Sequence, residues 1–341
     1  MSLTKLLAGA LIALSPLAAQ PPRRGGPRTF QQPQPPREVT IAAIPGVVAA
    51  GAQWKIAWQG DATSDGIAGT SDGGVLFAQE QTNHIGKVDK NDKFSVFLTT
   101  AHGPGAVDFD SKGRIFTVER SCTDPGGHLG VQPDQCTEPT DVALLTPERK
   151  IIADSFEGKG LGRVNDLTLN RRGDIYVTSN VVYHVTPDGK VSVVTDKLRP
   201  NGIVLSPDEK TLYITNGATI AAFDIQPDGS ATNQRDFGKL EGGGAGDGMA
   251  VDTKGNVYVT SGPGIQVLDK TGKYLGLIPT PRAAITVTFS GPGKKTLYAG
   301  CMGAKVGPNG TEFLTAPGVR NVAMTLYKIP MLSQGLKNRA R

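Results

Sequence analysis

Four polar residues stand at matching places in a weak repeat, and their side chains are of the kind that binds hard metal ions. Asp65, Asn165, Asn201 and Asp247 each open an apolar, strand-like stretch of the chain. Carboxylate and amide oxygens are the ligands that Ca²⁺ takes from proteins, with water completing the shell. If the fold brings the four together, they predict one divalent ion, with Ca²⁺ as the first choice and Zn²⁺, Mg²⁺ or Mn²⁺ as alternatives.

Three of these residues precede glycine, as Asp65-Gly66, Asn201-Gly202 and Asp247-Gly248, and the pairing has a simpler explanation. Asn and Asp before Gly shape tight turns without any ligand. A single pair of this kind would favour a turn. Four polar residues at one repeat position favour a metal site.

The repeat consists of a turn, an aliphatic residue, an aromatic residue and then small or β-branched residues. The aromatic residues are separated by 39, 60, 37, 45 and 40 positions, and they are Phe77, Phe116, Tyr176, Tyr213, Tyr258 and Tyr298. A strand-rich period near 40 residues is typical of propeller blades. We therefore expect an all-β, six-bladed β-propeller with a central metal site, in which segments 39–58 and 323–331 pair to close the ring.

The opening strand of each propeller blade is the innermost one, so its first residue should face the central channel. Counted back from the aromatic residues, these positions hold Asp65, Gly105, Asn165, Asn201, Asp247 and Thr286. The sequence thus predicts that these six positions surround the channel, with oxygen donors at the four polar residues described first and a hydroxyl at Thr286.

The two ends of the chain differ from the repeats. A lysine, an apolar run and small residues predict a signal peptide over residues 1–19, with a retained anchor as the alternative. Residues 20–38 are rich in Pro and Arg and predict a tether, residues 39–331 form the propeller, and residues 332–341 are a basic tail. We expect a periplasmic or secreted protein with no transmembrane segment in the mature chain.

Charge and cysteine content narrow the classes of function. The chain carries a net charge of +5, but residues 39–331 alone carry −2, which argues against nucleic-acid binding. Export predicts a disulfide between Cys122 and Cys136, whereas Cys301 follows an apolar stretch and should be a buried thiol. No Cys/His cluster suggests structural zinc.

Three segments resemble the SMP-30/gluconolactonase family, also called regucalcin-like. They are Arg163-Val164-Asn165-Asp166, Arg199-Pro200-Asn201-Gly202 with the residues that follow, and Gly246-Asp247-Gly248-Met249. The resemblance covers roughly residues 60–330. It implies a six-bladed propeller that hydrolyses sugar lactones with a bound divalent metal.

The resemblance also implies roles for individual residues. Asp65, Asn201 and Asp247 would bind the metal, Asn165 would bind the metal or the substrate, and Asp247 would serve as general base. Glu119 and Arg120 match a Glu-His pair that faces the substrate in the family, although a solvated ion pair is equally consistent with them. Asp65-Gly66-Ile67 departs from the family's Glu-Gly-Pro, and Gly105 and Thr286 stand where many relatives have Asn.

Three functions follow from these features. The leading hypothesis is hydrolysis of a small-molecule lactone. The metal would polarise the lactone carbonyl, and a carboxylate would take a proton from the attacking water. A calcium-dependent phosphotriesterase of the same fold is the second, and a non-catalytic, ligand-binding envelope propeller is the third. A Ser-His-Asp hydrolase is disfavoured because none of the four histidines lies in a nucleophile-elbow context. The oligomeric state cannot be predicted.

Overall fold

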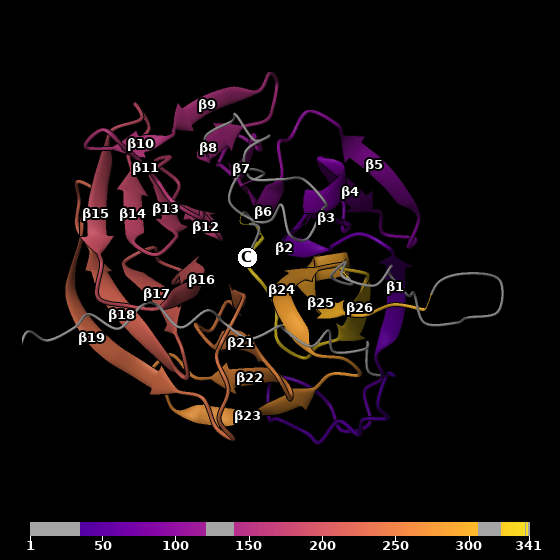
Figure 1. Ribbon diagram of the computed structural model, residues 1–341. Helices are drawn as coiled ribbons and strands as arrows, with labels where there is room; N and C mark the ends of the chain where they lie inside the picture. The colour runs from indigo at the N-terminus through magenta and orange to yellow at the C-terminus, as the bar shows by residue number, and fades with distance from the viewer. Residues whose placement is uncertain (1–34, 121–139, 306–321, 338, 340–341) are drawn as a thin grey trace, which may run out of the picture. The chain divides into compact units, whose positions relative to one another are not determined.

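Six four-stranded antiparallel sheets stand around a common centre in the computed structural model (Figure 1). The structure describes residues 35–120, 140–305, 322–337 and 339, all within the compact unit Gln32–Arg341. The predicted six-bladed propeller is thereby confirmed. Residues 1–19, most of the predicted tether, and both Cys122 and Cys136 lie outside the described residues.

Each four-stranded sheet is one blade, and in blades 1 to 5 the strands follow chain order from the innermost outward. Blade 1 contains β2 (Asp65–Gly69), β3 (Val75–Gln79), β4 (His84–Val88) and β5 (Phe94–Leu98). Blade 2 contains β6 (Pro104–Phe109), β7 (Ile115–Glu119), β8 (Asp141–Leu144) and β9 (Lys150–Ala153). Blade 3 contains β12 (Leu167–Leu169), β13 (Ile175–Thr178), β14 (Val182–Val185) and β15 (Val191–Thr195).

The second half of the ring repeats this plan. Blade 4 contains β16 (Pro200–Leu205), β17 (Thr211–Asn216), β18 (Thr219–Ile225) and β19 (Ala231–Lys239). Blade 5 contains β20 (Met249–Val251), β21 (Val257–Ser261), β22 (Gly264–Leu268) and β23 (Tyr274–Pro279). A short hairpin, β10 (Ser155–Phe156) with β11 (Lys159–Gly160), precedes blade 3, and the 3₁₀ turns η1 (Glu80–Thr82) and η3 (Pro292–Lys294) join strands.

Blade 6 closes the ring with strands from both ends of the described chain. It contains β24 (Ala284–Ser290), β25 (Thr296–Met302) and β26 (Met324–Pro330), and its outermost strand is β1 (Lys55–Gly60). The antiparallel pairing of β1 with β26 confirms the predicted closure, although only the last part of segment 39–58 is a strand. The innermost strand β24 in turn contacts β2 of blade 1. Closure of this kind joins the two ends of the described chain, and the edges that remain on each blade are short ones around the common centre and at the rim.

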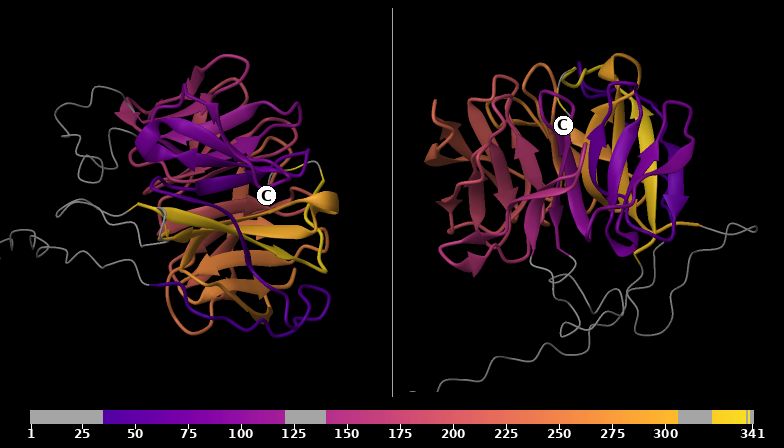
Figure 2. Two further views of the ribbon diagram at one scale, coloured as in Figure 1. Left: turned by 90° about the vertical axis from the view of Figure 1, so that its right-hand side faces the viewer. Right: turned by 90° about the horizontal axis from the view of Figure 1, so that it is seen from above.

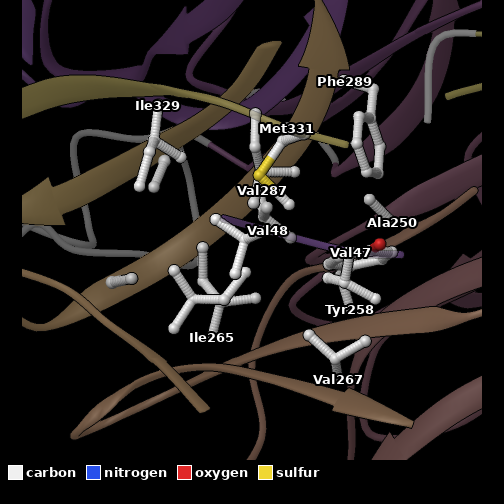
Figure 3. Packing of buried hydrophobic residues seen from close by; sticks show 14 of the residues in the cluster. Val47, Val48, Ala250, Tyr258, Ile265, Val267, Val287, Phe289, Ile329 and Met331 are labelled. Carbon is white, nitrogen blue, oxygen red and sulfur yellow. The ribbon is translucent and has the colours of Figure 1, made fainter. Parts of the chain in front are cut away.

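The hydrophobic core is divided among the interfaces between neighbouring blades. The six repeat aromatics all lie on the second strands, and each is at most 5% exposed. Figure 3 shows the cluster between blades 5 and 6, where Tyr258 and Phe289 meet with their rings 4.9 Å apart. Val47 and Val48, which precede β1, pack into the same cluster. Blade-to-blade burial therefore fixes the positions of the inner strands.

Segments outside the blades also pack on the propeller. Arg37, within the predicted tether, donates its backbone N–H to Pro281 O and its Nε to Thr280 O. In the predicted basic tail, the Arg339 guanidinium donates to the backbone oxygens of Leu205 and Ser206. Figure 2 shows the ring from the side, with the blade strands running across its thickness. No helix among the described residues has the length and apolar character needed to span a bilayer.

Candidate active site

The four predicted metal ligands share one cavity. Asp65, Asn165, Asn201 and Asp247 come from four different blades and line a space of about 340 Å³ where the innermost strands begin. The structure thus confirms that the fold brings these four side chains to one place. The other lining residues are Thr63, Glu80, Gln81, Arg120, Arg163, Ser179, Asn180, Pro200, Ile285, Met302 and Val322.

Second strands hold the main chain of two of these residues in place. Asn165 N–H donates to Thr178 O at 2.7 Å, and Asp247 N–H donates to Thr260 O at 3.0 Å. The hydroxyl of Thr178 also donates to Asn201 O, which ties blade 3 to blade 4. Because these backbone groups are satisfied by neighbouring strands, the side chains are left to face the cavity.

The glycines after the donors are explained by close packing of inner strands. A Cβ on Gly202 would lie 2.1 Å from the carbonyl oxygen of Asp247 in the next blade. A Cβ on Gly66 would lie 2.1 Å from Ala106 Cα, and Gly66 has a φ of +44°. Glycine is required here because adjacent blades approach each other at the cavity floor. Asp65-Gly66 and Asn201-Gly202 therefore belong to the inner strands β2 and β16, Asp247-Gly248 directly precedes β20, and all three pairs line the cavity with their polar residues.

The cavity concentrates negative charge. Burial is the main cause that raises the pKa of Asp247 well above its usual value, and the nearby carboxylates of Asp65 and Asp166 add to it. Burial also raises the pKa of Asp65, although the Arg120 guanidinium opposes this shift. Two carboxylates in such surroundings are stabilised as anions by a bound cation.

The donor set suits a hard divalent ion. Two carboxylates and two amide oxygens converge, which is the oxygen chemistry that Ca²⁺ prefers. In the part of the chain that the structure describes, no three His, Cys, Asp or Glu side chains form a metal-binding group. An ion in this cavity would therefore depend on the asparagine amides as well as on the carboxylates, and a thiolate or imidazole site is not formed there.

Hydrogen bonds already link the donors to one another. Asn165 Nδ2 donates to Asn201 Oδ1, and Asn165 Oδ1 accepts from Arg120 Nη1 at 2.6 Å. Arg120 Nη2 also lies 3.4 Å from Asp65 Oδ2. Arg120 is thus in the cavity, as expected for a residue at the substrate, but it contacts the predicted metal ligands directly.

Glu119 is not brought to the cavity. Its side chain is 1% exposed, accepts the backbone N–H of His102 at 2.8 Å and pairs with Arg149, whose Nε donates at 3.0 Å. Arg149 also lies 3.4 Å from Asp141, on the neighbouring strand β8. Glu119 and Arg120 are therefore not a solvated ion pair with each other, because both are buried and each pairs with a different residue, Arg149 and Glu80.

The prediction for the sixth ring position was wrong by one residue. Ile285 lines the cavity, whereas Thr286 is 2% exposed and accepts the N–H of Ile67 with its hydroxyl. The register of β24 shifts between Ala284 and Thr286, and this irregularity turns Ile285 toward the cavity. Blade 6 therefore contributes an apolar wall instead of a hydroxyl.

Sequence reasoning missed three charged residues of the site. Glu80 and Arg163 line the cavity, and Asp166 influences both cavity carboxylates while its own carboxylate accepts the N–H groups of Leu167 and Ile203. Glu80 follows Phe77 by three positions, as Glu119 follows Phe116, so the repeat contained a signal for it. Arg163 and Asp166 flank the Asn165 segment that carried the resemblance.

Known proteins share this fold and this sequence pattern. Residues 135–301 match the family model described as SMP-30/Gluconolactonase/LRE-like region. A gluconolactonase of Zymomonas mobilis is 30% identical over 184 residues, which cover 45% of this chain and 52% of the relative. The chain thus spans about half the length of this curated relative.

Solved structures agree in fold. A gluconolactonase from Xanthomonas campestris superposes with a TM-score of 0.66 at 22% identity, over 90% of this chain and 97% of that one. A calcium-binding protein, regucalcin, from Agrobacterium tumefaciens superposes with a TM-score of 0.62 at 16% identity, over 84% and 96%. Residues 135–301, just under half of the chain, are thus similar to the SMP-30/gluconolactonase family, and the chain shares its six-bladed fold with these solved structures.

Proposed function

We propose that this protein is a metal-dependent hydrolase that opens a sugar lactone. The observation that carries the proposal is the convergence of Asp65, Asn165, Asn201 and Asp247 in one cavity. Relatives of this chain include a gluconolactonase and a staphylococcal lactonase, and the latter is 27% identical, with 69% of its length covered. The calcium-binding protein regucalcin, which has a similar fold, supports a divalent ion in this protein, with Ca²⁺ as the first candidate.

The four donors would hold the ion, and the ion, when bound, would polarise the lactone carbonyl as a Lewis acid. Asp247 would take a proton from the water that attacks this carbonyl carbon, since its carboxylate lines the cavity beside the other three donors. The ring C–O bond then breaks, the ring oxygen receives a proton, and the product is the open hydroxy acid.

Polar lining residues would orient the sugar. Ser179 and Asn180 supply a hydroxyl and an amide on the blade 3 side, where Arg163 also lines the cavity. The amide of Asn180 and the guanidinium of Arg163 can donate to sugar hydroxyls or to the carbonyl side of the ring, and the Ser179 hydroxyl, which donates to Leu161 O, can accept. Ile285, Met302 and Val322 would cover the opposite, apolar part of the ligand and exclude bulk water. We also propose that the protein is periplasmic or secreted. This proposal depends only on the signal-peptide pattern of residues 1–19.

Metal analysis of purified protein, followed by a pH-indicator screen of aldonolactones with and without chelator, tests this function. We expect one divalent ion per chain and chelator-sensitive hydrolysis of at least one aldonolactone. A phosphotriester in the same screen is the control for the alternative chemistry. Hydrolysis of the phosphotriester alone, or of no ester at all, would contradict the proposal.

A further inference from the structure

Arg120 lies in the cavity as a buried cation among the predicted metal ligands. Its side chain is 3% exposed. Nη1 donates to Asn165 Oδ1 at 2.6 Å, and Nη2 lies 3.4 Å from Asp65 Oδ2. Two of the four oxygen-bearing side chains therefore already face a positive charge.

The surrounding residues hold this guanidinium in place. Arg120 Nε and Nη2 donate to the two carboxylate oxygens of Glu80, at 3.2 and 3.0 Å, and Glu80 is 6% exposed. A two-pronged pair of this kind fixes both orientation and charge. On the other side, a Cβ on Gly105 would lie 2.9 Å from Arg120 Cζ, so the absent side chain at Gly105 provides the space that the guanidinium fills.

A divalent ion and this guanidinium need the same oxygens. An ion held by Asn165 and Asp65 would share with Arg120 the side-chain oxygens to which its N–H groups now point. Like charges at such short range repel strongly outside bulk water. The two cations therefore compete, whereas the contact between Arg120 and Glu80 involves no oxygen of Asn165 or Asp65 and can persist.

We infer that Arg120 is a built-in competitor of the divalent ion: it neutralises the Asp65 side of the empty donor set and lowers the metal affinity of the site. Glu80 keeps the guanidinium at the cavity wall after the ion has displaced it from Asn165 and Asp65. The inference rests on the proposed metal site. It makes Arg120 a residue that determines metal affinity, distinct from the ligands themselves.

Calorimetric titration of chelator-treated protein with Ca²⁺ tests the inference without any turnover. We expect Arg120→Met to bind Ca²⁺ at least about tenfold more tightly than wild type, because the competing charge is gone. The double variant Arg120→Met/Glu80→Gln removes one charge of each sign and should retain most of this gain. Arg235→Met is the matched control, since Arg235 pairs with Asp224 on an exposed strand and its loss should change the Kd less than twofold.

Unchanged or weaker Ca²⁺ binding by Arg120→Met would overturn the inference and make Arg120 a structural support of the donors. A gain in the single variant that disappears in the double variant would also overturn it, because net charge alone would then explain the effect. If Arg120→Met does not fold, Arg120→Gln replaces it, since an amide can still donate to Glu80. Lactone hydrolysis by wild type is measured separately, so failure of the proposed function and failure of the competition are distinguished.

Discussion

The carboxylates of Asp65 and Asp247 line the same cavity and repel each other. This repulsion should lower the stability of the folded protein when no metal ion is bound. Burial raises the pKa of both carboxyl groups, and Arg120 Nη2 lies 3.4 Å from Asp65 Oδ2. In the proposed metal site, a bound cation would stabilise both carboxylates as anions. A ligand that binds only the folded protein stabilises it, so metal binding should raise Tm.

A second buried carboxyl pair gives a pH-dependent stability outside the cavity. Asp141 faces Glu119 across β8 and β7, and burial, assisted by the Glu119 carboxylate, raises the pKa of Asp141 to about 8. The folded protein then holds a proton that the unfolded chain loses near pH 4, so stability falls as pH rises between about 4 and about 8. Asp141→Asn cannot ionise and should escape this loss.

We therefore expect the Tm of Asp141→Asn to exceed that of wild type by a margin that grows from pH 5 to pH 8 and is constant above it. Differential scanning fluorimetry across pH 5–9 measures this margin. Asp224→Asn is the control, because hydrogen bonds from Asn233 and Arg235 lower the pKa of Asp224 and its margin should stay flat over that range. A margin for Asp141→Asn that does not vary with pH would refute the linkage.

At the level of single residues, the sequence predicted the four oxygen-bearing side chains of the cavity better than the charged residues that surround them. Asp65, Asn165, Asn201 and Asp247 could be found because one repeat position fixes where an inner-strand side chain points. The sequence could not show that Glu80, and not Glu119, lines the cavity, since both follow an aromatic residue by three positions. Their directions depend on partners distant in sequence, Arg149 for the former and Arg120 for the latter.

At the level of elements, the inner strands act as the walls of the site and depend on close contact between blades. The position with the least room is Gly202, beside the main chain that carries Asp247. A methyl group there would push β16 away from the segment before β20. Strain of this kind costs about 1–3 kcal/mol in packed interiors.

Gly202→Ala should therefore lower the free energy of unfolding by about 1–3 kcal/mol and weaken metal binding at the same time. Urea denaturation and Ca²⁺ titration of one sample measure both effects. Gly262→Ala is the matched control, because a Cβ at Gly262 meets no atom within 4 Å and its backbone φ is not in the left-handed region. Equal stability of the two variants would show that the blades can separate at Gly202 without loss.

The strand order within each blade followed from the regular alternation of turns and aromatic residues, because hairpins join neighbours in the chain. The sixth ring position did not follow, since a register shift in β24 leaves no mark in the spacing from Tyr298. Bulges of this kind depend on how the strand meets its neighbours. Counting residues can therefore place a strand in the sequence, but it can miss by one position the residue whose side chain faces the cavity.

At the level of the whole molecule, the two ends of the inner strands serve different purposes. The cavity lies where these strands begin, whereas Arg339 binds the backbone at the end of β16. Buried Lys294 donates to Gly69 O, at the end of β2, and to Phe289 O. The sequence indicated a closed ring through its six repeats, but the docking of residues 332–337 and 339 could not be predicted, because it depends on backbone oxygens that have no sequence signature.

The proposed function is that of a metal-dependent lactonase whose base is Asp247, and one comparison of wild type with a single variant tests it. Lactone hydrolysis is measured for wild type and Asp247→Asn, each after chelation and after reloading with Ca²⁺, with metal content determined in every sample. Wild type should lose activity on chelation and regain it with Ca²⁺. Folded, metal-loaded Asp247→Asn should be slower by about 10²-fold or more, because an amide cannot accept the proton. Full activity in chelated wild type, or in metal-loaded Asp247→Asn, would contradict the claim.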